Sequence, residues 1–253
     1  MINMLYLYGI IDSDQPYSFI ETTSGRQVYN LPVNGLGMIV SAADSKDAEK
    51  RTGNILAHNT VMERILEHFT VLPVSFGTLI NGASGVQELF NRYDGEFRRQ
   101  LQRLRGKVEM GVNVIWNVQQ ARVELPDSET LEALLRQKLH TGSPGHKYLL
   151  RKYRERAPEM YLQRMAAQNA KQIHSPLSAI AEEAHSSILR TPSLMLSGAY
   201  LLLRSNVSGF REEYVRLKKN YPNYKLLLSG PWPPYNFVKI NCTVGSDDRG
   251  DGF

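Results

Sequence analysis

Runs of apolar residues in the first third of the chain predict a β-sheet. Met4–Asp12 is rich in aromatic and branched residues and ends in polar turn formers, which is typical of a buried strand. Gln27–Leu31 and Gly37–Ala42 flank the sequence "PVNG", so we expect them to pair as a hairpin beside that strand. Val71–Ile80 indicates a further strand, with Pro73 at its start or on a sheet edge, because proline donates no ladder hydrogen bond.

Apolar residues with a period of 3.6 mark two amphipathic helices in the same part of the chain. One lies within Asp47–Phe69 and the other within Val86–Leu104, where Gly106 is placed to end the helix. Lys107–Asn117 then alternates as a strand. The order strand, hairpin, helix, strand, helix, strand predicts an α+β sandwich of the ferredoxin-like type over residues 1–118, with helices over one face of a sheet.

The second half predicts a domain of long helices and a small βαβ sheet over residues 119–238, followed by a flexible, polar tail at 239–253. Pro158 and Pro176 lack the amide N–H that a helix interior uses, so we expect them to kink or divide the long helical region. The expected elements are a helix at Ser128–His140, a helical region at Gly145–Leu189, a strand at Leu194–Arg204, a helix at Ser208–Lys219 and a strand at Tyr224–Leu228.

Composition places the chain among ordinary globular proteins. Of the 253 residues, 42% are apolar and 22% charged. No apolar run approaches the roughly 20 residues that span a bilayer, and the start "MINMLYLYGIIDSD" lacks a basic segment and a cleavage site. The lone Cys242 agrees with a reducing compartment. We therefore expect a cytoplasmic protein without a membrane partner.

The sequence shows no motif for catalysis, a metal or a cofactor. The six histidines have no metal-ligand spacing, and there is no GxSxG motif. The glycines of "NGLG" and "FGTLINGASG" lack the pattern of a phosphate-binding loop. His58 lies on the apolar side of its helix, which indicates a packed or hydrogen-bonded histidine. A hydrolase or transferase of unknown type stays an open alternative, because acids distant in sequence meet only in the fold.

Basic residues gather in two places. Between Lys147 and Lys171 there are seven Lys or Arg, and "KYLLRKYRER" interleaves two tyrosines with them. A solvated helical face explains this pattern, and nucleic-acid binding by residues 147–156 is the alternative. Arg151 and Arg154 in this stretch also suit an acidic protein partner. A second cluster lies within Arg98–Lys107.

Four segments in this order resemble the gas vesicle protein GvpF/GvpL family, and GvpF more than GvpL. They are "MLYLYGII" at the start, "HNTVMERILEHFTVLPVSFGTLI" at 58–80, "FRRQLQRLRGKVEMGVNVIWN" at 97–117 and "SGPWPPYNFV" at 229–238. The resemblance implies a non-enzymatic accessory or minor structural protein, without a cofactor, that associates with the gas vesicle in the cytoplasm. It also implies assembly through contacts with the hydrophobic shell protein GvpA and other Gvp proteins, rather than with nucleic acid.

The segment "SGPWPPYNFV" combines one of two tryptophans with three prolines. Pro231 is expected to end the preceding strand, and polyproline geometry would place Trp232, Tyr235 and Val238 on one face. That face either closes over the second domain as a lid or stays exposed as a platform for a partner. The candidate partner-binding residues are Trp232, Pro233, Pro234, Tyr235, Phe237, Arg151 and Arg154.

Overall fold

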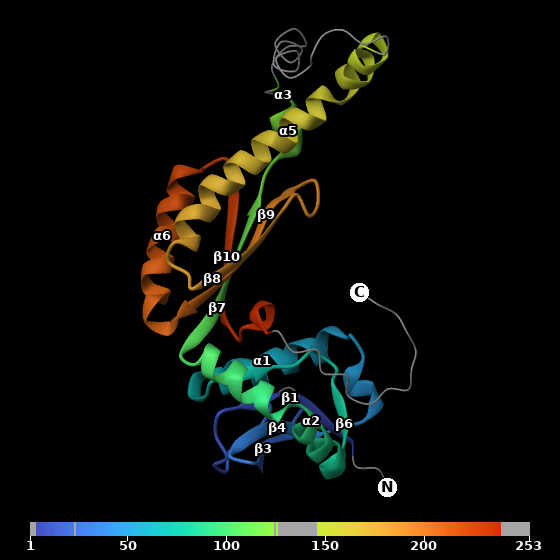
Figure 1. Cartoon of the computed structure of the whole chain (residues 1–253), viewed down its shortest axis with the longest axis vertical. Coiled ribbons are helices and arrows are strands. Elements are labelled where there is room, and N and C mark those ends of the chain that lie inside the picture. The colour runs from blue at the N-terminus through green and yellow to red at the C-terminus, as the bar shows by residue number, and fades with distance from the viewer. Residues whose placement is uncertain (1–3, 23, 124, 126–145, 239–253) are drawn as a thin grey trace. The chain divides into compact units, whose positions relative to one another are not determined.

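The computed structural model describes residues 4–22, 24–123, 125 and 146–238, with only the backbone described at 146–155 (Figure 1). These residues form two compact units. The first runs to Glu109 and resumes at Gly230, and the second is Met110–Ser229. The chain therefore changes unit within two strands, β7 (Lys107–Ile115) and β10 (Lys225–Trp232). The domain limits 1–118 and 119–238 stay predictions.

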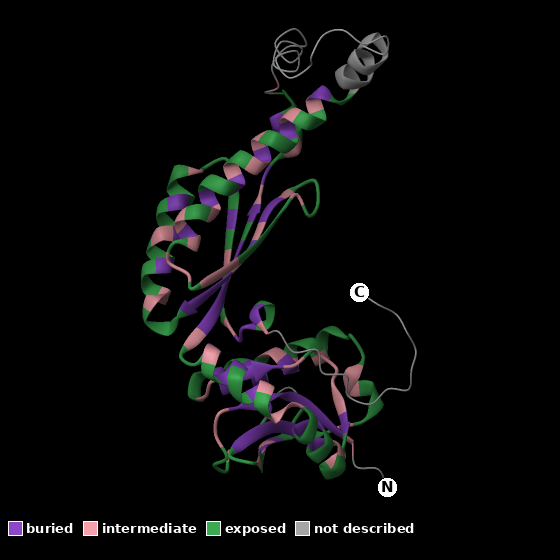
Figure 2. Cartoon of the chain, in the orientation of Figure 1, coloured by how far each residue is buried: buried purple, intermediate pink, exposed green. Residues whose placement is uncertain are grey.

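The first unit contains a six-stranded sheet with β1 near its centre. The order is β2-β3-β4-β1-β5, and β6 pairs with another part of β1. All of these pairs are antiparallel. The almost continuous apolar run of β1 is buried along its length, as Figure 2 shows. The strands are β1 (Met4–Ile11), β2 (Ser18–Ile20), β3 (Gln27–Val33), β4 (Leu36–Ala42), β5 (Val71–Pro73) and β6 (Leu79–Asn81).

Two long helices pack against β1 and β5 of this sheet, α1 (Thr52–His68) and α2 (Gly82–Leu104). A short 3-10 helix, η1 (Ser45–Ala48), precedes α1. The buried residues of α1 recur every three or four positions, as the apolar stripe predicts. They are His58, Val61, Met62, Ile65 and Leu66. The predicted α+β class is confirmed.

The single strand expected over Val71–Ile80 is wrong, because two short strands form there. Both pair with β1, but β5 pairs with Gly9–Ile11 and β6 with Met4–Tyr6. Between them the chain leaves β1 over residues 75–77 and turns at Gly77, whose φ is 85°. Gly77 donates its amide N–H to the hydroxyl of Tyr6, 2.8 Å away. A side-chain acceptor thus replaces the ladder bond, which apolar patterning does not reveal.

The second unit packs helices against a four-stranded sheet of order β10-β7-β9-β8. Its core takes residues from α5, including Ala166, Ala170 and Ile173, and from the strands and α6. Its elements are α3 (Val118–Val123), α5 (His146–Ser178), β8 (Glu183–Ile188), β9 (Leu194–Leu203), η2 (Arg204–Asn206) and α6 (Val207–Asn220), with parts of β7 and β10.

The long helical region differs from the expectations in two respects, while a kink at its prolines stays a prediction. Helix α5 is not divided, since it runs through both Pro158 and Pro176. Packing of its apolar face at Ala166, Ala170, Ile173 and Leu177 offsets the local cost of proline. The helix ends at Ser178 rather than continuing to Leu189, and β8 follows. β8 pairs antiparallel with β9, from Glu183 opposite Leu201 to Ile188 opposite Leu196. This pairing outweighs the helical spacing of the apolar residues in the segment.

Several sequence predictions fall outside the described residues. These are the helix at Ser128–His140, Cys242 and the tail at 239–253. Among the residues that the structure describes, no helix is long and apolar enough to cross a bilayer. The same residues hold no cluster of three or more metal-ligating side chains.

Candidate functional site

The end of β10 differs from its expected course. Pro231 does not stop the strand, which continues to Trp232. β10 lies at the edge of its sheet, and an edge strand is where a sheet tolerates proline. The prediction of polyproline geometry is also wrong, because Tyr235–Phe237 form a short 3-10 helix, η3. The backbone N–H of Phe237 donates to the carbonyl oxygen of Pro234 in this turn.

Residues 233–238, called the return segment below, bind to the first unit rather than closing over the second. The Tyr235 hydroxyl lies 3.0 Å from Nε2 of His58. Asn236 donates its backbone N–H and its side-chain amide to the carboxylate of Glu109, at 2.9 and 2.5 Å. Arg103 donates to the carbonyl oxygen of Phe237, whose side chain is fully buried. Pro233 and Pro234 are buried too, and Trp232 is half-buried.

His58 lies at the centre of an aromatic cluster that joins β1, α1 and the return segment. Its ring stacks on Tyr8, with centroids 5.5 Å apart. Tyr6 and Phe76 present edges at 5.8 and 5.6 Å, and Tyr235 lies at 6.4 Å. The apolar stripe of α1 aims the histidine inward, so the prediction of a packed, hydrogen-bonded histidine is confirmed.

Both ring nitrogens of His58 are engaged by tyrosine hydroxyls. Tyr6 lies 3.1 Å from Nδ1, opposite the Tyr235 contact at Nε2. A neutral imidazole has one donor and one acceptor, so one hydroxyl donates to the ring and the other accepts from it. Burial lowers the pKa of His58 to about 4 and raises the pKa of Tyr6 to about 12. Burial of its hydroxyl also raises the pKa of Tyr235. The histidine is therefore neutral at pH 7.

A pocket of about 320 Å³ opens beside this cluster. Tyr235 contributes one wall, and the side chain is 37% exposed although its hydroxyl points to His58. On α1, Ile55 lines the pocket and is 39% exposed, and the next residue in the chain, Leu56, is 57% exposed. The lining residues are Lys50, Ile55, His58, Asn59, Phe76 and Tyr235. The site is thus an apolar depression in the first unit, completed by the return segment.

The family model "Gas vesicle synthesis protein GvpL/GvpF" matches residues 4–239, nearly the whole chain. The chain belongs to the GvpL/GvpF family. It is 25% identical over 256 residues to gas vesicle protein F1 of Halobacterium salinarum, and the match covers 100% of both chains. It is 29% identical over 195 residues to gas vesicle protein L of a Streptomyces species, covering 73% of this chain and 68% of the relative.

Solved structures show the same fold. The crystal structure of GvpF from Anabaena superposes with a TM-score of 0.79 at 20% identity, covering 95% of this chain and 100% of that one. GvpF from Microcystis aeruginosa gives a TM-score of 0.75 at 20% identity, with the same coverage. The GvpL/GvpF chain is therefore a gas vesicle protein of the α+β class, and its role is related to gas vesicles.

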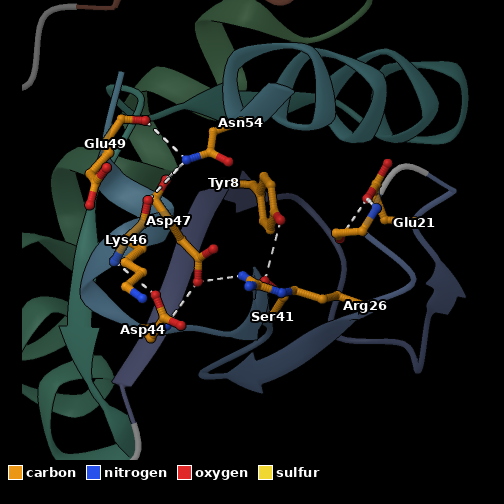
Figure 3. A network of polar contacts seen from close by, with 10 residues as sticks. Tyr8, Glu21, Arg26, Ser41, Asp44, Lys46, Asp47, Glu49 and Asn54 are labelled. Carbon is orange, nitrogen blue, oxygen red and sulfur yellow. Dashed lines mark hydrogen bonds and ion pairs between the residues drawn. The ribbon is translucent and has the colours of Figure 1, made fainter. Parts of the chain in front are cut away.

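The loop before α1 holds one side of the pocket in place in this GvpL/GvpF protein. The side chain of Asp44 caps η1 by accepting a hydrogen bond from the Lys46 backbone N–H at 2.7 Å. In turn, the Asp44 backbone N–H donates to the carboxylate of Asp47 at 2.8 Å, which completes a capping box. Asp47 also pairs with Arg26, the residue before β3, as Figure 3 shows. The Asn54 side chain donates to the carbonyl oxygens of Lys46 and Glu49, at 2.9 and 3.0 Å. These bonds hold the backbone of the loop that carries Lys50.

Replacing Asp44 with alanine is expected to lower the free energy of unfolding by about 1 kcal/mol, because the cap of η1 is lost. Urea denaturation followed by circular dichroism measures the change. Glu63→Ala, on the exposed face of α1, is the control and should have little effect. Equal stability of the Asp44 variant and the wild type would show that the cap contributes nothing to this loop.

The basic residues divide into two groups. In the second cluster, Arg98 pairs with Asp94 at 2.9 Å, Arg99 pairs with Glu96, and Arg103 binds the return segment. These charges are thus committed to contacts within the first unit. Arg151 and Arg154 lie on the part of α5 whose side chains the structure does not describe. Partner binding by them, and by the return segment, stays a proposal.

The sequence did not point to most residues that surround His58 or hold the return segment. Tyr6, Phe76 and Glu109 come from β1, the turn before β6 and β7, and each carries an ordinary strand or loop pattern. Tyr235 was singled out for its proline-rich setting, but its contact with His58, 177 positions earlier, was not predicted. The inward position of His58 was the one signal in the sequence that pointed to this region.

Proposed function

We propose that this GvpL/GvpF protein is a non-enzymatic accessory or minor structural protein of gas vesicle assembly. It binds the hydrophobic shell protein GvpA and other Gvp proteins, in the cytoplasm and in association with the vesicle. Family membership over residues 4–239 supports the link to gas vesicles. The exposed apolar depression beside His58 supports binding of an apolar partner.

A shell subunit that will line a gas space carries apolar surface, which aggregates when it is left in water. A partner that covers this surface until incorporation needs an apolar patch with a polar or charged surround. Ile55, Leu56 and Tyr235 supply the patch, and Lys50 and Asn59 supply the polar surround. This combination is the observation that carries the proposal.

The state of His58 supports a binding role rather than acid–base catalysis. A general base needs a pKa near the working pH and a free nitrogen within reach of its substrate. Burial lowers the pKa of His58 to about 4, and both nitrogens already contact tyrosine hydroxyls. The residue is thus suited to holding the return segment. We propose no cofactor for the site.

Co-expression with GvpA tests the proposal. The tagged full-length chain is expected to keep GvpA in the supernatant after centrifugation and to retain it on an affinity resin. A tagged unrelated protein of similar size controls for nonspecific capture. Absence of GvpA and of every other Gvp protein from the eluate would overturn the proposed function.

A further inference from the structure

The pocket beside His58 is apolar at its floor and charged at its rim, and this difference indicates the kind of ligand that fits it. Its floor is His58, whose two nitrogens are both occupied by the hydroxyls of Tyr6 and Tyr235. Phe76 and Ile55 add apolar walls. The floor thus offers no unused hydrogen-bonding group of the histidine to an incoming ligand. An apolar side chain fits there, whereas a polar one would lose its hydration without compensation.

The rim of the pocket, in contrast, carries a cation. Lys50 is exposed, and within the described part of the chain no carboxylate forms an ion pair with it. The neighbouring acids are engaged elsewhere, since Glu49 pairs with Arg51 and Asp47 with Arg26. The capped loop fixes the backbone that carries Lys50. The rim therefore presents an ammonium group available to an anion.

We propose that the pocket binds a protein segment that inserts an apolar side chain against His58 and Phe76 and places a carboxylate beside Lys50. The volume of about 320 Å³ is at the lower end for small-molecule sites and suits one or two side chains. Leu56, the residue that follows Ile55 in α1, is exposed as well and offers a second apolar contact, which favours a peptide segment as the occupant. The occupant is thus an apolar segment bearing an Asp or Glu.

This inference rests on the proposed function, with the shell protein GvpA as the partner that supplies the segment. The apolar contact provides affinity, and the ion pair at the rim fixes the register of the segment on α1. An exposed charge pair weakens as salt rises. The contribution of Lys50, unlike that of Ile55, is therefore expected to shrink at high ionic strength.

Capture of co-expressed GvpA by tagged full-length variants tests the inference. Ile55→Asp and Lys50→Glu are expected to reduce captured GvpA by about tenfold, the loss of a significant interface contact. Val215→Asp and Lys218→Glu make the same changes at exposed positions of α6 and should capture as much as the wild type. Washing at high salt should lessen the Lys50→Glu defect and leave the Ile55→Asp defect.

The outcomes separate the two claims. If the wild type captures GvpA and both pocket variants match their α6 controls, the pocket assignment is overturned while the proposed function stands. If the wild type captures no GvpA, the proposed function fails and the pocket assignment fails with it. Lys50→Glu changes an exposed side chain, so the test holds even if Ile55→Asp lowers stability. Crosslinking from a photoreactive residue at position 56 should label a GvpA peptide that contains Asp or Glu; a peptide without either contradicts the role of Lys50.

Discussion

Replacing Phe237 with alanine is expected to lower the free energy of unfolding by about 3–5 kcal/mol. The side chain is fully buried, and a Phe-to-Ala change in a core loses both apolar burial and packing. The carbonyl of the same residue accepts from Arg103, so the position also anchors the backbone of the return segment. Loss of the anchor should loosen the contacts of Tyr235 and Asn236 as well.

Urea denaturation of the full chain, followed by fluorescence and circular dichroism, measures this effect. Tyr235→Phe is the matched control within the same turn, because it removes one hydroxyl and should cost only about 1 kcal/mol. If Phe237→Ala costs less than Tyr235→Phe, the return segment is not an integral part of the first unit. The result also separates a structural role of this segment from a role limited to partner binding.

Stability is expected to fall by roughly 3 kcal/mol as the pH drops from about 6.5 to about 4, through His58 alone. Its pKa is about 4 in the folded chain, against an ordinary value of 6.5. Between these values the unfolded chain binds the proton and the folded chain does not, so stability rises with pH. The contribution is complete above 6.5 and is lost as pH falls toward 4. Each pKa unit corresponds to about 1.4 kcal/mol.

The comparison of wild type with His58→Gln isolates this contribution from the carboxylates, which titrate in both proteins. Measured at intervals between pH 4 and 7.5, the unfolding free energy of the wild type minus that of the variant should increase by roughly 3 kcal/mol as the pH rises. Parallel curves over this range would show that His58 is not held neutral by its surroundings. Tyr6, Tyr8 and Tyr235 around the ring stay protonated throughout, because burial raises the pKa of each.

The elements that the sequence predicted well are those whose own residues decide their structure. β1 is a continuous apolar run, and α1 and α2 carry long stripes with a helical period. The elements that were wrong depend on distant partners. β8 is a strand because β9 lies beside it, and β5 and β6 are separated by a turn tied to Tyr6. The spacing of apolar residues along the sequence does not reveal such contacts.

In the candidate site, too, the residues that were predictable are those whose own helix or motif decides their position. His58 was expected to pack inward from its helical position alone, and the motifs around it placed the chain in its family. The target of the return segment was not predictable, because it depends on Arg103 and Glu109, two charged residues whose sequence setting is ordinary. Their roles follow from the path of the chain after β10.

The return of the chain to the first unit has a consequence for biosynthesis. A ribosome releases residues in order, and the strands and helices up to Glu109 emerge long before Tyr235 and Phe237. Until those last residues arrive, His58 lacks one hydroxyl partner and Arg103 lacks its carbonyl. The second unit is continuous from Met110 to Ser229, so all of its residues leave the ribosome before Tyr235 and Phe237. The first unit therefore begins with the N-terminus but is completed only when the last part of the chain is made. Truncation before Phe237 leaves this unit incomplete.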